Sequence, residues 1–293
     1  MRIINLIENT EGHEGCAFDH GLSFYVETKK HKLLFDLGPS EETLHNADAL
    51  GIDIKAVDTV ILSHGHYDHS GGIIPFSMIN DKALIYMQST AVGDYYSDDG
   101  QDASEGFRYI GIDRNIAKLP QVRLLDKDMV IDDELELFVI RHRSHDLPFT
   151  NRRLLVREGG DYRRDDFAHE HFLVIRQDNR SILMSGCAHN GILSIMDEYI
   201  DRYKKAPDLV ISGFHLMKKT DYRDSEIAEI EDIARELKKY PTKFVTCHCT
   251  GTAAFDLMKE IMGESLVYVH SGEEIYSGNL MRLLSVFPTK VPD

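Results

Sequence analysis

A short stretch of the sequence, ILSHGHYDHSGG at residues 61–72, concentrates side chains that bind metal ions. Its metal-competent residues are His64, His66, Asp68 and His69. Alternate side chains of an extended segment point the same way, so His64 and His66 can grip one ion. Asp68 and His69 then fall on the next turn of the loop, where they can serve a second ion, and Asp68 could also hold a metal-bound water. A lone histidine is usually a surface residue, but three histidines with an aspartate at this spacing predict a metal site.

The elements around this stretch must hold it in place. Short β-like runs fill the N-terminal half and the middle of the chain, at residues 2–7, 22–28, 32–38, 59–64, 83–87 and 135–140. Helices are predicted at 41–50 and from the pair Gly71-Gly72 to about Met78. The metal stretch therefore lies where a strand runs out into a loop. Such loops often carry functional groups, because the strand fixes their position.

The C-terminal third alternates strands and helices more regularly. Two β-runs at 171–177 and 181–186 are joined by a hairpin-like turn at Asp178-Asn179. After them, helices at about 191–205, 224–240 and 251–262 alternate with strands at 208–214, 243–248 and 266–270. The whole order predicts an α/β fold of the αββα type, a sandwich of two mixed β-sheets flanked by helices. We expect a single domain spanning residues 1–293.

Two segments interrupt this pattern. Residues 93–115 are polar and rich in glycine, which predicts an excursion over the surface. Residues 141–170 form an insertion that is dense in charge and poor in apolar periodicity. The plain interpretation is a solvated loop, but long loops are often functional, and we expect this one to act as a lid or pocket wall.

The composition of the chain limits which partners and which cellular location can be expected. The 293 residues carry a formal net charge of −16, whereas nucleic-acid backbones and anionic membranes attract basic surfaces, so neither is expected as a partner. The N-terminus lacks the apolar core of a signal peptide, and no run approaches the roughly 18 apolar residues of a membrane span. A cytoplasmic location is expected. The four cysteines form neither a disulfide framework nor paired C-x-x-C motifs.

The pattern H-x-H-x-D-H, after a β-run ending in Leu62-Ser63, resembles the hallmark of the metallo-β-lactamase fold, the family that includes glyoxalase II, lactonases and RNase Z. KLLFDLG resembles the first motif of that family, whose aspartate, Asp36 here, buttresses the metal loop. Other stretches resemble one branch of the family, namely HGLSFYVET, NADALGIDI, SGCAHNGI, SGFHL and CHCTG. That branch comprises the dihydropteroate-synthase-like or 7,8-dihydropterin-6-methyl-4-(β-D-ribofuranosyl)aminobenzene 5'-phosphate synthase proteins. The resemblance runs from about residue 3 to residue 275.

The resemblance implies the remaining metal ligands. In most of the family an aspartate that bridges two metals stands where Cys187 stands in SGCAH, and some β-lactamases use cysteine there. His189 then supplies a ligand that a separate histidine gives elsewhere, and His248 matches the final histidine ligand. For Cys187, a buried packing role is the open alternative. Cys247 and Cys249 flank His248 and, on strand geometry, should point away from the metal as packing residues.

Further histidines compete for a place in the site. His215 ends the strand before the last ligand strand, where we favour substrate binding or proton transfer, with metal ligation as second choice. His20 is expected to line the pocket and bind substrate, with a capped turn as the alternative. The sequence leaves open whether any histidine around the charged insertion joins the site, the candidates being His142, His145, His169 and His171.

These observations predict a metal-dependent hydrolase of a small, anionic substrate. The expected ligands are His64, His66 and His189 for a first divalent ion and Asp68, His69 and His248 for a second, with Cys187 bridging or lying close. Zinc is the expected ion, with Mn²⁺, Fe²⁺ or Ni²⁺ as alternatives. A bound divalent ion lowers the pKa of its water to about 7, which generates hydroxide at neutral pH. Asp68 and His215 are the predicted catalytic residues.

Two other functions stay open. The branch's named synthase activity would form a C–C bond, with the metal as Lewis acid. The third possible function is a metal-occupied binding protein without turnover. A pure binding protein, however, has no need of a metal site that is so open. Phosphate-loop, nucleophile-elbow and dinucleotide-binding motifs are absent from the sequence. Neither the substrate nor the oligomeric state follows from the sequence.

Overall fold

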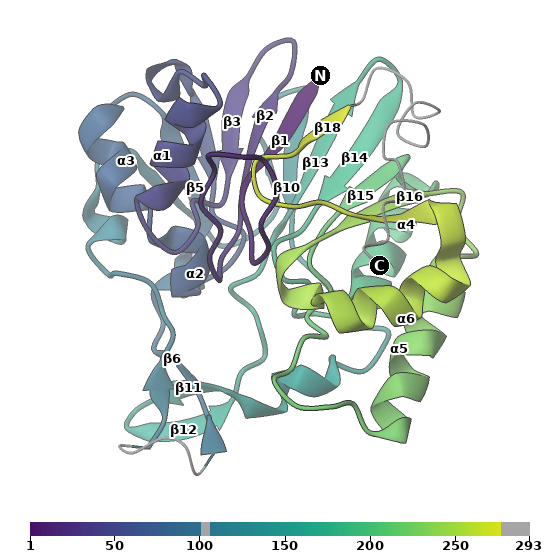
Figure 1. The fold of residues 1–293 in the computed structure, drawn as a ribbon. Helices are drawn as coiled ribbons and strands as arrows, with labels where there is room; N and C mark the ends of the chain where they lie inside the picture. The colour runs from purple at the N-terminus through teal and green to yellow at the C-terminus, as the bar shows by residue number, and fades with distance from the viewer. Residues whose placement is uncertain (101–105, 277–293) are drawn as a thin grey trace.

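Two β-sheets face each other at the centre of the molecule (Figure 1). The computed structural model describes residues 1–100 and 106–276. The first sheet has the order β18-β1-β2-β3-β4-β5-β8. Its strands are β1 (Arg2–Ile7), β2 (Ser23–Glu27), β3 (Lys32–Phe35), β4 (Thr59–Ile61), β5 (Leu84–Gln88), β8 (Val122–Leu125) and β18 (Glu274–Tyr276). Strands β3, β4, β5 and β8 are parallel, whereas β1 pairs antiparallel with both β2 and β18.

The second sheet has the order β17-β16-β15-β14-β13-β10-β9. Its strands are β9 (Met129–Val130), β10 (Leu135–Phe138), β13 (Phe172–Gln177), β14 (Arg180–Met184), β15 (Leu209–Ile211), β16 (Lys243–Thr246) and β17 (Leu266–Tyr268). Strands β14 to β17 run parallel, and β9, β10, β13 and β14 pair antiparallel. Asp178 and Asn179 both have positive φ in the turn between β13 and β14, as a tight hairpin requires.

Helices cover the outer face of each sheet. The helices are α1 (Glu42–Ala49), α2 (Tyr67–Ser70) and α3 (Ile73–Ile79) beside the first sheet, and α4 (Ile192–Tyr203), α5 (Asp224–Leu237) and α6 (Thr252–Met262) beside the second (Figure 1). Successive residues of a strand therefore both meet apolar neighbours: Phe24 packs between the sheets, while Tyr25 packs toward the helices. This explains why the central strands are apolar on both faces.

A third, smaller sheet lies beside the sandwich, with the order β12-β11-β6-β7 (Figure 1). Its strands are β6 (Tyr95–Ser97), β7 (Arg108–Tyr109), β11 (Leu154–Glu158) and β12 (Asp161–Arg164). The described parts of 93–115 and 141–170 therefore contain short strands, which the expected surface excursion and the plain interpretation of a solvated loop had not included. The two segments pair with each other over a small apolar cluster that includes Tyr95, Leu154 and Val156. These strands are short, and all residues of β7 and β12 are exposed, so no apolar alternation marked them in the sequence.

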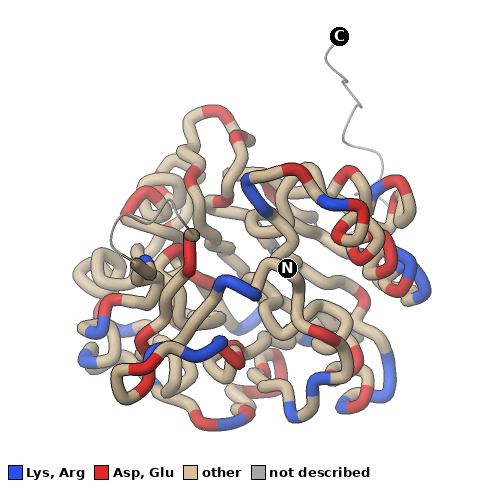
Figure 2. Tube along the Cα trace, turned by 90° about the horizontal axis from the view of Figure 1, so that it is seen from below, with Lys and Arg blue, Asp and Glu red and all other residues tan. Residues whose placement is uncertain are grey.

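Charged side chains are distributed over the surface. In the view of Figure 2, acidic and basic segments are interspersed around the rim of the molecule. Within the described residues, no helix is both long and apolar enough to span a membrane.

Candidate metal centre

The candidate ligands follow strands that belong to both main sheets. β4 ends at Ile61 and leads to the stretch with His64 and His66. β14 ends at Met184 and leads to Cys187 and His189, and β16 ends at Thr246, two residues before His248. These strand ends open onto one cavity, whose lining includes His66, Asp68, Cys187, His189 and His248. Residues that lie far apart in the sequence are therefore brought together, as the sequence predicted.

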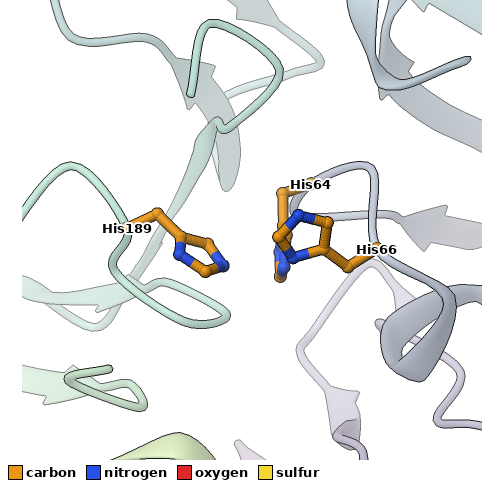
Figure 3. Close-up of side chains that lie close together, drawn as sticks. All are labelled: His64, His66 and His189. Atoms are coloured by element: carbon orange, nitrogen blue, oxygen red, sulfur yellow. The ribbon is translucent and has the colours of Figure 1, made fainter. Parts of the chain in front are cut away.

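His64, His66 and His189 form the most compact group. Their ligand atoms lie within 4.8 Å of one another, and Figure 3 shows the three rings converging from two separate loops. All three side chains are buried, and the Nε2 atom of each has no hydrogen-bond partner among the described residues. Buried polar atoms without partners are costly and rare in folded proteins. A divalent ion at the point where the three atoms converge would satisfy all of them.

The opposite ring nitrogens are held by the protein. His64 Nδ1 lies 2.8 Å from Ser63 Oγ, and His189 Nδ1 lies 3.0 Å from Asn151 Oδ1. Burial lowers the pKa of His66 to about 3 and holds the pKa values of His64 and His189 well below the usual range. The rings are therefore neutral, which leaves their lone pairs available to an ion.

A second group surrounds Asp68. Its Oδ2 lies 3.4 Å from His248 Nε2, 3.4 Å from His20 Nε2 and 3.7 Å from His69 Nε2. Burial alone would raise the pKa of Asp68, but these three histidines hold it well below the usual range. His248 Nδ1 lies 2.7 Å from Asn9 Oδ1, which leaves Nε2 facing the carboxylate. The arrangement offers oxygen and nitrogen donors to a second ion.

The sequence suggested that Asp68 lies on a loop, but the structure places it in a helix. It is the second residue of α2 and is 7% exposed. His66 is still extended, but the chain turns into a helix at Tyr67. Asp68 and His69 therefore project from a helical turn rather than an open segment.

Asp36 supports the metal loop, as the family resemblance implied. Its carboxylate accepts hydrogen bonds from Ser63 N–H and Ser63 Oγ–H at 2.7 Å each, and its Oδ2 lies 2.7 Å from His69 Nδ1. Burial would lower the pKa of His69, but Asp36 and Asp68 raise it to about 9. One buried carboxylate therefore fixes both ends of the loop between β4 and α2.

Two cysteines lie in the same cavity. Cys187 Sγ is 3.2 Å from His69 Nε2, and it falls within one candidate ligand group with His64 and His69 and another with His248 and Cys249. Cys249 lines the cavity, so its expected role as a packing residue facing away was wrong. β16 ends at Thr246, and a 3₁₀ turn begins at His248 with φ of 50°, which breaks the alternation of a strand. Cys247 packs between the two sheets, as expected.

His215 and His20 both line the cavity. Both ring nitrogens of His215 lack a hydrogen-bond partner among the described residues, and its ring centroid lies 4.1 Å from that of His189. His20 Nε2 faces Asp68, while His20 Nδ1 lies 3.3 Å from Asn9 Nδ2. Both histidines therefore lie in the same cavity as the candidate ligands.

The histidines around the charged insertion divide into two kinds. His169 Nδ1 accepts a hydrogen bond from Gly65 N–H at 2.9 Å, and its Nε2 lies 3.1 Å from Asp165. His171 is likewise engaged at both nitrogens, by Gln88 and by the carbonyl of Leu62. These two rings brace the metal loop from outside. The other two lie elsewhere: His142 is exposed and His145 pairs with Asp197.

Several supporting residues were not found from the sequence. The buried Glu8 accepts hydrogen bonds from His248 N–H at 2.9 Å and from Tyr268 O–H at 3.0 Å. Asn151 also donates to the carbonyl of His189 at 2.7 Å. Glu8 follows the apolar strand β1 directly, and a polar residue at a strand end was a usable signal. Asn151 lies in a charged segment that gave no signal.

Two arginines of the small sheet region also line the cavity. Arg108 Nε lies 2.6 Å from Asp99 Oδ2, and Arg153 Nη1 lies 3.7 Å from Asp99 Oδ1. One carboxylate therefore faces two guanidinium groups, which leaves an excess of positive charge at this wall. Arg153 and Leu154 come from the charged insertion, so part of that insertion forms a wall of the cavity.

Comparison with known proteins gives three relevant similarities. A sequence model described as the metallo-beta-lactamase superfamily matches residues 17–215. The 7,8-dihydropterin-6-methyl-4-(beta-D-ribofuranosyl)-aminobenzene-5'-phosphate synthase of Methanocaldococcus jannaschii is 27% identical over 300 residues, covering 94% of this chain and 96% of that protein. The crystal structure of Tm1679, a metal-dependent hydrolase of the beta-lactamase superfamily, has a TM-score of 0.78 at 28% identity, covering 95% of this chain and 100% of that one.

A more distant structure supports the fold alone. Zn²⁺-bound PqqB from Methylobacterium extorquens has a TM-score of 0.55 at 12% identity, covering 94% of this chain and 100% of that chain. Together the similarities confirm the expected αββα fold and the resemblance to the synthase branch.

Proposed function

The chain belongs to the metallo-beta-lactamase superfamily, and from that premise we propose that it is a metal-dependent hydrolase of a small, anionic substrate. One observation carries the proposal: three buried histidine Nε2 atoms converge without any hydrogen-bond partner among the described residues. The similarity to a metal-dependent hydrolase over nearly the whole chain supports it.

We assign the donors to two divalent ions, with zinc as the preferred metal. His64, His66 and His189 would hold the first, and Asp68, His69 and His248 the second, with Cys187 between the two groups. Such ions act as Lewis acids and activate water at neutral pH. The donor set suits zinc, because histidine nitrogen, carboxylate oxygen and cysteine sulfur are all common zinc ligands.

The remaining cavity residues bind the substrate and move protons. Arg108 and Arg153 present guanidinium groups, which match carboxylates and phosphates in geometry and charge. His215 has two free ring nitrogens beside the first ligand group, so it can deliver a proton to a leaving group. His20 lies on the Asp68 side of the cavity and would contact the other end of the substrate.

A substrate panel tests the proposal. The zinc-loaded protein is assayed on esters, lactones, thioesters and phosphodiesters, first as wild type and then as Asp68→Asn. We expect hydrolysis of an anionic member of the panel and a loss of more than tenfold in kcat/KM for the variant, which is about 1.4 kcal/mol of transition-state stabilisation. An inactive wild type that retains its metal would contradict the hydrolase assignment.

A synthase is the second candidate, because the named synthase matches over almost the full length of both chains. The same cavity would then bring an aromatic ribofuranosyl phosphate to a dihydropterin, and the two arginines would bind the phosphate. Incubating the metal-loaded protein with such a pair, and following product formation by mass spectrometry, separates the two functions. Condensation without hydrolysis of the panel would favour the synthase.

A further inference from the structure

We propose that Cys187 and Cys249 both bind the second ion as thiolates, so that this ion has a sulfur-rich site. The inference rests on the proposed two-ion centre but not on hydrolysis. It adds a donor, Cys249, that lies directly after a histidine ligand in the sequence.

The geometry brings the two sulfurs to one histidine. The ligand atoms of Cys187, His248 and Cys249 all lie within 4.8 Å of one another. All three side chains are buried, with exposures of 3%, 0% and 4%, respectively. His248 Nε2 has no hydrogen-bond partner among the described residues. This nitrogen, which also faces the Asp68 carboxylate, thus lies close to two sulfurs, and together these atoms form the start of a zinc coordination shell.

The surrounding backbone makes room for the sulfur of Cys249. A Cβ atom at position 213 would lie only 2.4 Å from Cys249 Sγ, so Gly213 leaves the space that this sulfur occupies. His215 N–H donates a hydrogen bond to Cys249 Sγ at 3.3 Å. Hydrogen bonds from the surroundings commonly orient metal ligands and tune their electron density. Cys249 is therefore held in place rather than simply filling a gap.

The two ion sites would then differ in chemistry. The first group offers three imidazoles, whereas the second offers two thiolates in addition to Asp68, His69 and His248. Thiolates select soft or borderline ions such as zinc, and they disfavour magnesium and manganese. Unequal donor sets also predict that the two ions are lost separately when a chelator is added.

Cobalt substitution tests the proposal without a substrate. The protein is stripped of metal, loaded with Co²⁺ and examined for the near-ultraviolet charge-transfer band that arises from thiolate-to-cobalt bonds. The variants are Cys187→Ser and Cys249→Ser, and the matched control is Cys247→Ser, a cysteine that packs between the sheets. We expect a band in the wild type, a reduction of about a half in each test variant because each loses one of the two thiolate ligands, and an unchanged band in the control.

Two results would overturn the proposal: a wild type without the band, or a Cys249→Ser variant that keeps all of it. If a test variant fails to fold, an anomalous-scattering crystal structure of the zinc-loaded wild type decides. Both sulfurs should lie near the Zn–S distance of about 2.3 Å, and a Cys249 sulfur beyond about 3 Å from zinc excludes ligation. Because neither readout uses turnover, sulfur ligation in a protein that hydrolyses nothing would overturn the hydrolase proposal and leave this one standing.

Discussion

Four of the five candidate histidine ligands are held at one ring nitrogen by a specific neighbour. Ser63 holds His64, Asp36 holds His69, Asn151 holds His189 and Asn9 holds His248, all at Nδ1. The result is the same in every case, because Nε2 is left to face the cavity. Partners of this kind orient metal ligands, and losing one typically weakens metal binding.

The first prediction concerns Asp36. Asp36→Asn should lower metal affinity by about 10- to 100-fold, because the amide is a weaker partner for His69 than the carboxylate. The backbone should tolerate the change, since φ at this position is 60° and asparagine adopts such angles readily. Competition with a chromophoric chelator measures the affinity.

A matched control is Asp58→Asn. Asp58 also pairs with a histidine, His31, at 2.8 Å, but it does not line the cavity. The Asp58→Asn substitution should leave metal affinity unchanged. Equal losses in the two variants would show that Asp36 acts only through general stability.

Among individual residues, the sequence predicted the candidate ligands that lie close together along the chain. The spacing in His64, His66, Asp68 and His69 is visible in a single short stretch. Asn151 is not, because its link to His189 exists only after the insertion folds against the loop that follows β14. The inward direction of Cys249 was also hidden, since it depends on the positive φ of His248.

At the scale of elements, α2 docks closely on the loop that follows β3. Gly71 ends α2, and a Cβ atom there would lie 1.9 Å from the carbonyl oxygen of Pro39 and 2.2 Å from its carbon. The obstacle is backbone, which cannot rotate away. α2 carries Asp68 and His69, so this close contact also sets the position of two candidate ligands.

Gly71→Ala should therefore lower the free energy of unfolding by about 3 kcal/mol, in the range of overpacked sites. Urea denaturation of the metal-free protein measures it. Met78→Ala, at an exposed position of the neighbouring α3, should change it by no more than about 0.5 kcal/mol. A Gly71→Ala protein as stable as the wild type would show that α2 can shift, and its metal content should then be altered.

The small sheet sets one wall of the cavity. Arg153→Met should raise KM for the anionic substrate by about tenfold, because a hydrogen bond to a charged group contributes about 1.5–3 kcal/mol. Metal content should stay the same, since an arginine side chain stays protonated and offers no lone pair to an ion. Steady-state kinetics and elemental analysis give both quantities.

Arg157→Met is the control for this prediction. Arg157 lies in β11, which begins directly after Arg153, and it is exposed as Arg153 is, but it does not line the cavity. Its guanidinium lies 5.8 Å from the centre of the Tyr162 ring. The KM of the Arg157→Met variant should match that of the wild type. A similar rise in both variants would indicate a nonspecific effect of net charge.

Most strands and helices of the sandwich could be predicted from apolar patterns, and β1, β13 and α4 begin within a residue or two of their expected positions. The edge strands β8, β9 and β18 were missed, because they are short and two of them carry mostly exposed or half-buried side chains. The small sheet could not be predicted either. Its central strands β6 and β11 pair across more than fifty residues of sequence, as Tyr96 with Leu155, and no local pattern encodes that partnership.

At the scale of the whole molecule, the candidate centre joins the two sheets. His64 and His66 follow a strand of the first sheet, whereas His189 and His248 follow strands of the second. An ion held between them links both halves of the sandwich. Binding to the folded state alone adds about 2.7 kcal/mol of stability when the free ligand is at 100 times its Kd.

Metal removal should therefore lower the Tm reversibly. Thermal unfolding with and without a chelator measures the shift, and zinc should restore it. His189→Ala removes one nitrogen donor of the first group. In this variant the chelator should therefore cause only a small part of the Tm decrease that it causes in the wild type. A wild type with the same Tm in both conditions would show that ions do not stabilise the fold.

The pairing at the edge of the first sheet has a consequence for biosynthesis. A ribosome releases β1 first, yet β1 pairs with β18, with Ile3 opposite Ile275, and the neighbouring Glu8 holds the backbone of His248. The nitrogen donors of the first group are all translated once His189 is made, but the second group waits for His248. A nascent chain would thus complete its two proposed metal sites in succession, and β1, the first of the described strands to emerge, is among the last to be covered.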